Sequence, residues 1–253
     1  MRLDRFLSNL PRFNRQEVRR LLVERRVRVD GQPIADGRHE VRVFSRIELD
    51  GELLQAGKPA RYFMLHKPAG WVSATEHDEH PTVLDLLDEP DKHELHLAGR
   101  LDLNTTGLLL ITNDGQWSRR LTQPQTHLPK VYRVETGEPI LAEYVDTFAR
   151  GLYFRFEDLT TRPARLQILD SHLALLTLVE GRYHQVKRMF GHFQNPVLRL
   201  HRQSIGPLQL DPALAEGAYR VLRADELEAL QRALDCSSSV EALAPCIEPT
   251  GSA

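Results

Sequence analysis

A single carboxylate stands where the chain turns into an apolar run. The segment AGRLDLNTTGLLLIT covers residues 98–112 and places Asp102 two residues after Arg100, just before an Asn-Thr-Thr-Gly turn. The residues that follow Gly107 are apolar or nearly so, which is typical of a buried strand. An aspartate held beside cations in an apolar setting stays ionised and can act as a nucleophile.

Two other interpretations of Asp102 compete with catalysis. An aspartate before a turn commonly caps that turn by bonding its own backbone. The sequence DLNTTG also begins like the calcium loop of an EF-hand. We reject calcium because the twelfth loop position, which should be a bidentate Glu, is Asn113, and the positions before it are apolar. The residues alone leave turn capping and catalysis open.

The composition limits the class of protein. A length of 253 residues allows one or two domains, and an apolar share of 41% is enough for a hydrophobic core. No apolar run is long enough to span a bilayer, and the charged start MRLDRFLSNL lacks the apolar stretch of a signal peptide. The two cysteines, Cys236 and Cys246, stand near the C-terminus, which excludes a disulfide framework and a cysteine-based zinc site. We therefore expect a cytoplasmic protein.

The near-neutral net charge of −2 conceals two basic blocks. Residues 1–50 carry 12 arginines against 8 acidic residues, a net charge of +4. Residues 100–210 carry 14 basic against 10 acidic residues, again +4, whereas the stretches 51–99 and 211–253 are each at −5. This asymmetry indicates a polyanionic partner.

The first basic block predicts a helix with an arginine-rich face. Asn14 is a good N-cap, and Glu17 stands at the third helical position, where it completes a capping box. Arg15 and Arg19 are one helical turn apart and share a face. The guanidinium group suits bidentate contact with phosphate. Two alternating segments that end in Asp-Gly, RVRVDG and VRVFSRIELDG, predict short strands with tight turns.

The pattern changes twice along the chain. Residues 51–60 mix Gly, Pro and polar residues and are predicted to be a linker after a first domain of residues 1–50. Residues 61–233 alternate strand-like and helical segments, which predicts a strand-rich α+β domain, with a turn at Pro68–Gly70 between two strands. Residues 234–253 are rich in Ser, Pro and Gly and are predicted to be a disordered tail.

Two resemblances add to these patterns. The segment from MRLDRFLSNL to RVRVDG resembles a small α/β RNA-binding module known from a ribosomal protein. The segments RYFMLHKPAGWVSAT, HPTVLDLLDEP, AGRLDLNTTGLLLITNDG, KVYRV and EGRYHQVKRMF are similar, in order, to the pseudouridine synthases that act on ribosomal RNA. The resemblance implies a larger catalytic domain with a mixed, mostly antiparallel sheet. It also implies isomerisation of uridine to pseudouridine with no cofactor and no metal.

The resemblance also implies roles for individual residues. Asp102 matches the catalytic aspartate, Tyr132 the tyrosine that lies against the flipped uracil, and Lys187 the basic partner of the aspartate. Arg100 would occupy the gap that the extruded base leaves. The other arginines expected to contact RNA are Arg182, Arg188, Arg2, Arg5, Arg15 and Arg19.

The implied substrate is uridine 516 of 16S rRNA, and the attacked atom is either C1′ of the ribose or C6 of the base. Two alternatives stay open. The same chemistry could act on 23S rRNA, or the chain could be an inactive rRNA-binding assembly factor. We expect a monomer whose partner is ribosomal RNA or an assembling small subunit.

Overall fold

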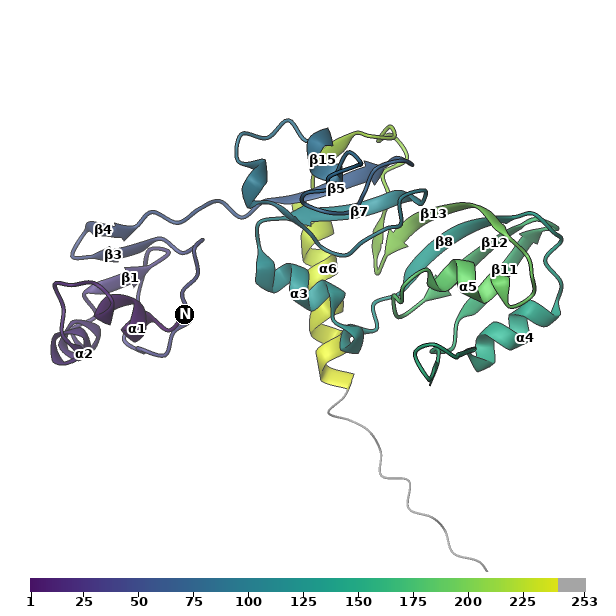
Figure 1. The fold of residues 1–253 in the computed structure, drawn as a ribbon. Helices are drawn as coiled ribbons and strands as arrows, with labels where there is room; N and C mark the ends of the chain where they lie inside the picture. Colours follow the sequence, from purple (N-terminus) through teal and green to yellow (C-terminus); the bar gives the residue numbers. More distant parts are fainter. Residues whose placement is uncertain (241–253) are drawn as a thin grey trace, which may run out of the picture. The chain divides into compact units, whose positions relative to one another are not determined.

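The chain folds into two compact units. The structure is a computed structural model that describes residues 1–240, with side chains up to Cys236. The first unit is Met1–Ala60 and the second begins at Arg61 (Figure 1). Among the described residues, no helix is both long and apolar enough to cross a membrane.

The first unit packs two helices on a small sheet. Its helices are α1 (Leu3–Ser8) and α2 (Arg15–Val23), and the predicted capping box of α2 is present, with the Asn14 side chain accepting from the backbone of Gln16 and Glu17. The antiparallel sheet has the order β2-β1-β3-β4. Its strands are β1 (Val27–Val29), β2 (Gln32–Pro33), β3 (Ile47–Leu49) and β4 (Glu52–Gln55).

Two Asp-Gly pairs form the hairpin turns of this sheet. Val29 pairs with Gln32 across Asp30–Gly31, and Leu49 pairs with Glu52 across Asp50–Gly51. All four turn residues have positive φ, as tight hairpins with right-handed twist require. The second turn creates β4, so the linker predicted over residues 51–60 is wrong in its first half. The strand was missed because ELLQ is short and has no clear alternation.

The second unit is built on one large mixed sheet. Its strand order is β11-β12-β8-β13-β7-β5-β15, with β14 on β13 and β6 on β7. Every pairing is antiparallel except that of β7 with β13. The strands are β5 (Tyr62–Lys67), β6 (His96–Leu97), β7 (Thr106–Thr112), β8 (Lys130–Thr136), β11 (Arg165–Asp170), β12 (Leu173–Leu178), β13 (Val197–Ile205), β14 (Leu208–Gln209) and β15 (Tyr219–Val221).

Helices cover both faces of this sheet. The helices are α3 (Gly115–Thr122), α4 (Glu143–Arg150), α5 (Gln185–Gly191) and α6 (Ala224–Val240). The short 3₁₀ helices are η1 (Val83–Leu86), η2 (Lys92–Glu94) and η3 (Pro124–Thr126), and a hairpin of β9 (Tyr153–Phe154) and β10 (Leu159–Thr160) follows α4. Figure 1 shows α4 and α5 beside β8, β11 and β12, and α3 and α6 below β5 and β7. The predicted α+β class is confirmed.

The central strand β7 belongs to both hydrophobic cores. Leu109 and Ile111 lie in the core that includes α4 and α5, whereas Leu108 and Leu110 lie in the core that includes α3 and α6. All four side chains are fully buried. A strand covered on both faces has no polar alternation, which explains the continuous apolar run after Gly107.

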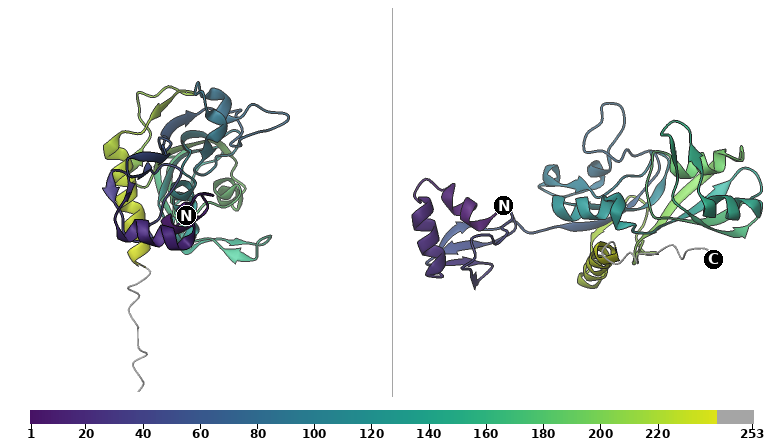
Figure 2. Two further views of the ribbon diagram at one scale, coloured as in Figure 1. Left: turned by 90° about the vertical axis from the view of Figure 1, so that its left-hand side faces the viewer. Right: turned by 90° about the horizontal axis from the view of Figure 1, so that it is seen from below.

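Helix α6 corrects the predicted tail. The helix runs to Val240, so the disorder predicted from residue 234 is wrong for residues 234–240, and residues 241–253 lie outside the described part of the chain. Both views of Figure 2 show α6 as the yellow helix of the second unit. Leu230 and Leu234 are fully buried in the core with α3. This apolar contact continues the helix past the point where the composition turns polar.

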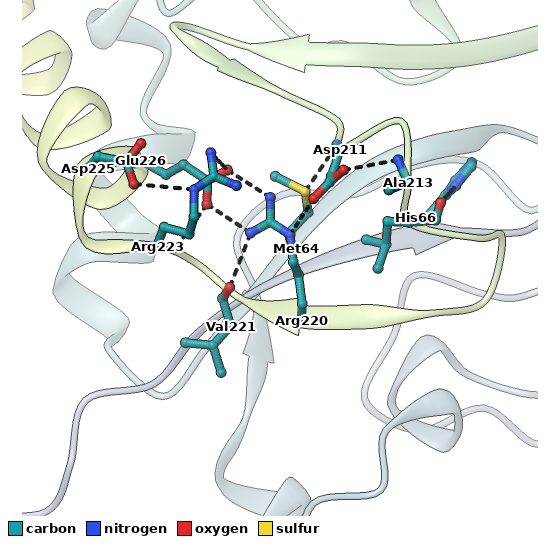
Figure 3. Close-up of polar contacts among 10 residues, drawn as sticks. Met64, His66, Asp211, Ala213, Arg220, Val221, Arg223, Asp225 and Glu226 are labelled. Carbon is teal, nitrogen blue, oxygen red and sulfur yellow. Dashed lines mark hydrogen bonds and ion pairs between the residues drawn. The ribbon is translucent and has the colours of Figure 1, made fainter.

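A charged cluster anchors the start of α6 to the sheet edge. The guanidinium of Arg220, on β15, donates to Glu226 at 2.7 and 2.8 Å and to Asp211 at 2.8 Å (Figure 3). Arg223 adds an ion pair to Glu226 at 2.9 Å. The hydrogen bond from Arg220 holds the pKa of Glu226 below its usual range despite partial burial.

The turn at residues 68–70 is present, but the strand predicted after it is not. Beyond this turn, Val72 makes only a single parallel bridge to Thr82. The Gly70 amide and the Ser73 hydroxyl instead hold the segment around Asp102.

Candidate active site

A cavity of about 600 Å³ opens beside the start of β7. Its walls come from the segment around Asp102, from β8 and β13, and from the segment that leads into α5. Four predicted site residues, Arg100, Asp102, Tyr132 and Arg182, lie in its lining, together with His184. The structure therefore brings together residues from four separate parts of the sequence.

Asp102 faces two basic side chains from the region of α5. The Nζ atom of Lys187 lies 4.0 Å from Oδ2, and Nε2 of His184 lies 3.6 Å from Oδ1. The carboxylate is only partly buried, with 27% of its side chain exposed. Lys187 therefore places a positive charge beside the carboxylate. An ionised oxygen that is open to a cavity can act as a nucleophile.

The backbone around Asp102 is held by a buried lysine. Lys67, the last residue of β5, is fully buried. Its Nζ donates to the carbonyl oxygens of Leu103 at 3.0 Å, Thr105 at 2.9 Å and Pro68 at 2.9 Å. The three N–H groups of the ammonium are thus all satisfied. Because two of these carbonyls flank Asp102 on its C-terminal side, the lysine fixes where the carboxylate points.

Further contacts fix the same segment on both sides of Asp102. The Ser73 hydroxyl donates to the Leu101 carbonyl at 2.7 Å and accepts from the Leu101 amide at 3.1 Å. The amide of Gly70 donates to the Leu103 carbonyl at 2.9 Å. The Asp102 carbonyl accepts from the amide of Thr105 at 3.0 Å, which closes the turn. The polypeptide therefore holds Asp102 from both sides, as a preorganised site requires.

Lys67 makes no ion pair with any described residue. Desolvation lowers the pKa of Lys67 to about 8, while the charge of Asp102 acts in the opposite direction and the charge of Arg202 adds to the lowering. A buried cation without a bonded carboxylate is costly unless hydrogen bonds compensate it. The three carbonyl contacts supply that compensation, so the position of the turn and the burial of Lys67 depend on each other.

The floor of the cavity carries an aromatic ring and two more cations. Tyr132, on β8, is 8% exposed and pairs directly with Arg202, on β13. Lys130 precedes Tyr132 by two residues, so both side chains leave β8 on one face. Gly107, with φ of +110°, lets β7 approach β13 at Arg202, where a Cβ would lie 2.3 Å from the Arg202 carbonyl oxygen.

The other arginines that were predicted to contact RNA differ in their exposure and in their ion pairs. Arg100 is exposed at the cavity, whereas Arg182 pairs with Glu180 at 3.1 Å. Arg188 does not line the cavity; it pairs with Glu157 at 2.6 Å and stacks on Phe154 at 3.6 Å from the ring centroid. These contacts hold α5 to the β9–β10 hairpin. In the first unit Arg2 pairs with Asp4, while Arg5, Arg15 and Arg19 are exposed and make no ion pair with a described residue.

Three cations near the site, Lys67, Lys130 and Arg202, were not predicted from the sequence. Lys67 and Lys130 stand in the conspicuous segments HKP and KVYRV, but local sequence cannot distinguish a buried lysine from an exposed one. Arg202 lies in VLRLHRQSI, a segment interpreted only as a strand. Lys67 ends β5, Lys130 begins β8, and Arg202 stands among other polar residues of β13, so no local signal marked the three as buried cations. Among residues 1–236, no cluster of His, Cys, Asp or Glu has the geometry to hold a metal ion.

Replacing Lys67 with Met should loosen the segment around Asp102. The carbonyls of Leu103 and Thr105 lose their donor, so the free energy of unfolding should fall by about 1–3 kcal/mol in urea denaturation. Hydrogen exchange at the Gly70 and Thr105 amides should accelerate by about tenfold or more. Lys92→Met, at a partly exposed site outside the cavity, should change the free energy of unfolding by less than about 0.5 kcal/mol. Unchanged exchange at both amides in Lys67→Met would contradict the proposed role of Lys67.

Two known protein families and several known proteins match this chain. The family described as RNA pseudouridylate synthase matches residues 61–192, and the S4 domain matches residues 1–47. The ribosomal small subunit pseudouridine synthase A of Pseudomonas aeruginosa is 63% identical over 227 residues, which covers 90% of this chain and 99% of that protein. Its namesake from Escherichia coli is 43% identical over 227 residues, covering 90% and 98%.

A solved structure agrees with these sequence matches. A crystal structure of a pseudouridylate synthase has 41% sequence identity and a TM-score of 0.66, and the match covers 91% of this chain and 99% of that one. The family match spans residues 61–192, and with it every residue that approaches Asp102. The chain therefore belongs to the RNA pseudouridylate synthase family, and it is an isomerase.

Proposed function

We propose that this protein converts one uridine of 16S rRNA to pseudouridine, with Asp102 as the nucleophile. The names of its relatives, which specify the ribosomal small subunit, support this substrate. Within that RNA we assign uridine 516, on the resemblance of the chain to the enzymes that modify it. We propose that the enzyme acts in the cytoplasm and as a monomer.

The reaction moves a bond without adding or removing atoms. The bond between N1 of uracil and C1′ of ribose breaks, the base turns, and C5 bonds to C1′. The proton that leaves C5 is balanced by one gained at N1. The enzyme therefore needs a nucleophile, a surface that holds the detached base, and a means of exposing the nucleotide. Asp102 supplies the nucleophile, at either C1′ or C6.

The single observation that carries the proposal is the placement of Asp102. Its carboxylate opens to the cavity, lies within 4.0 Å of two basic groups, and stands on a backbone held by Lys67 and Ser73. If Asp102 only capped the turn, its position at a cavity and beside two basic groups would have no explanation. Tyr132 offers an aromatic surface on which a flipped base can stack and still turn.

The arginines that line the cavity can help to extrude a base from the RNA. Arg100 is two residues from Asp102 and is open to solvent at the cavity. Unstacking a nucleotide costs a few kcal/mol, about what a stacked and phosphate-bound guanidinium can offset. Arg182, in the segment that leads into α5, also lines the cavity and can contact the backbone of the extruded nucleotide.

Asp102→Asn should abolish the chemistry and leave RNA binding nearly unchanged. The amide keeps the size of the side chain but cannot attack, so pseudouridine formation in 16S rRNA should fall by at least about 10⁴-fold. Asp146→Asn, an exposed change on α4, serves as the matched control and should retain full activity. Pseudouridine mapping of both rRNAs from a deletion strain identifies the target. A loss in 23S rRNA would favour the alternative substrate, and no loss in either would favour an assembly factor without catalysis.

The N-terminal unit supplies a second RNA contact. The S4 match covers most of it, and α2 presents Arg15 and Arg19 on one exposed face. We propose that Arg5, Arg15 and Arg19 bind phosphates and that the catalytic unit from Arg61 onward positions the uridine. Tethering two weak modules raises the effective concentration of each for one RNA.

Replacing both Arg15 and Arg19 with Gln should weaken the salt dependence of RNA binding. The slope of log Kd against log salt concentration should decrease by about 0.7–0.9 for each phosphate that the protein no longer neutralises. Arg232→Gln, an exposed charge change on α6, is the control and should leave the slope within error. An unchanged slope in the double variant would mean that α2 does not contact the RNA backbone. Measurement by filter binding across a salt series provides the slopes.

A further inference from the structure

Two cations in the cavity take no part in the steps assigned to Asp102 and Tyr132. Lys130 and Arg202 both line the cavity, and neither makes an ion pair with a carboxylate among residues 1–236. The acidic side chains of the lining are Asp102 and Glu180, which face Lys187 and Arg182. The cavity floor therefore carries positive charge that the protein does not neutralise.

The guanidinium group of Arg202 is only partly satisfied by hydrogen bonds within the described residues. The residue is 3% exposed, its Nε donates to the Leu108 carbonyl at 2.8 Å, and its Nη1 approaches the Arg100 carbonyl at 3.4 Å. Its Nη2 is buried and has no hydrogen-bond partner among the described residues. A buried guanidinium nitrogen without a partner is costly, and such groups are commonly satisfied by a ligand.

The ammonium group of Lys130 also has N–H donors available to a ligand. Its Nζ donates to the Leu128 carbonyl at 3.0 Å, which leaves two N–H groups of the ammonium for another acceptor. Burial lowers the pKa of Lys130 to about 8, and the charge of Arg202 adds to the lowering. The two cations are thus close enough to repel each other. A negatively charged or strongly polar oxygen between them would relieve that repulsion.

Depth within the cavity indicates which part of a nucleotide this oxygen belongs to. Arg202 pairs in register with Tyr132, and Lys130 leaves β8 on the same face as that ring. The exposed arginine of the cavity, Arg100, stands near Asp102 instead. A uracil that stacks on Tyr132 would place its carbonyl oxygens toward the buried cations, and the phosphate of its nucleotide toward the exposed arginine.

We propose that Lys130 and Arg202 are catalytic residues that stabilise negative charge on the uracil oxygens. This inference rests on the proposed function and adds residues to it. When the N1–C1′ bond breaks, its electron pair stays with the ring and spreads onto O2 and O4. Attack at C6 also places charge on O4, so the cations serve either route. The charge disappears when C5 bonds to C1′ and the C5 proton is replaced by one at N1.

Binding of free bases tests the inference without turnover. Uracil and 6-azauracil have nearly the same shape, but the extra ring nitrogen makes 6-azauracil the stronger acid and an anion near neutral pH. The enzyme should bind 6-azauracil more tightly than uracil in calorimetry. Lys130→Met should lose about tenfold or more in affinity for 6-azauracil and much less for uracil, and Lys130→Arg should restore the preference. Equal losses for both bases, or no loss, would overturn the inference.

Kinetics provide the second readout. A donor aimed at developing charge should matter in the transition state, so Lys130→Met and Arg202→Lys should lower kcat for pseudouridine formation by about 100-fold with little change in KM. Lys92→Met, outside the cavity, is the matched control. A rise in KM alone, or competition by inorganic phosphate that Lys130→Met removes, would assign the cations to the RNA backbone and overturn the inference.

The two proposals fail in different ways. If the wild-type enzyme forms no pseudouridine in 16S rRNA, the proposed function is wrong, whatever the variants do. If the wild type is active and Lys130→Met turns over at the same rate, only the role of the cationic floor is wrong. Thermal melting of each variant, compared with the rescue by Lys130→Arg, separates a loss of chemistry from a loss of folding.

Discussion

The proposed catalytic centre depends on the burial of one ammonium group. Lys67 ends β5 beneath the turn that carries Asp102, and it makes three hydrogen bonds, all to main-chain carbonyls. Carbonyl oxygens satisfy the cation without neutralising it, so its charge remains available to an anion nearby. The contribution of Asp102 to the pKa of Lys67 shows that the two charges interact. One buried lysine thus holds the geometry of the turn and adds positive potential near Asp102, the proposed nucleophile.

The sheet makes this arrangement rigid. Strand β7 follows the turn directly and is covered on both faces, by the core with α4 and α5 and by the core with α3 and α6. Its parallel neighbour β13 contributes Arg202, whose guanidinium approaches main-chain carbonyls on both sides of the turn. The antiparallel neighbour of β13 contributes Tyr132 and Lys130. A cavity built from adjacent strands leaves little freedom for the groups that surround a detached base.

Structural features that depend on residues close together in the sequence could be predicted from it. The capping box of Asn14 and Glu17 and the Asp-Gly hairpins are of this kind. The aspartate at the start of a turn was recognisable as a candidate, and resemblance decided between capping and catalysis. Features that depend on contacts between distant parts of the sequence could not be predicted. The polar composition after residue 234 suggested disorder, but Leu234 is buried by α3 and its neighbours. Lys67, Lys130 and Arg202 acquire their roles only when β5, β8 and β13 meet in one sheet.

The most direct measurement is a structure of the Asp102→Asn enzyme bound to a short 16S rRNA fragment that contains the target uridine. We predict that the uridine is extruded, that its ring lies on Tyr132, and that C1′ or C6 lies within about 3.5 Å of the side chain at position 102. The O2 or O4 atom should face Lys130 and Arg202, and Arg100 should occupy the gap in the RNA. A uridine that stays stacked in the RNA, or a base bound outside the cavity, would contradict the proposed role of Asp102.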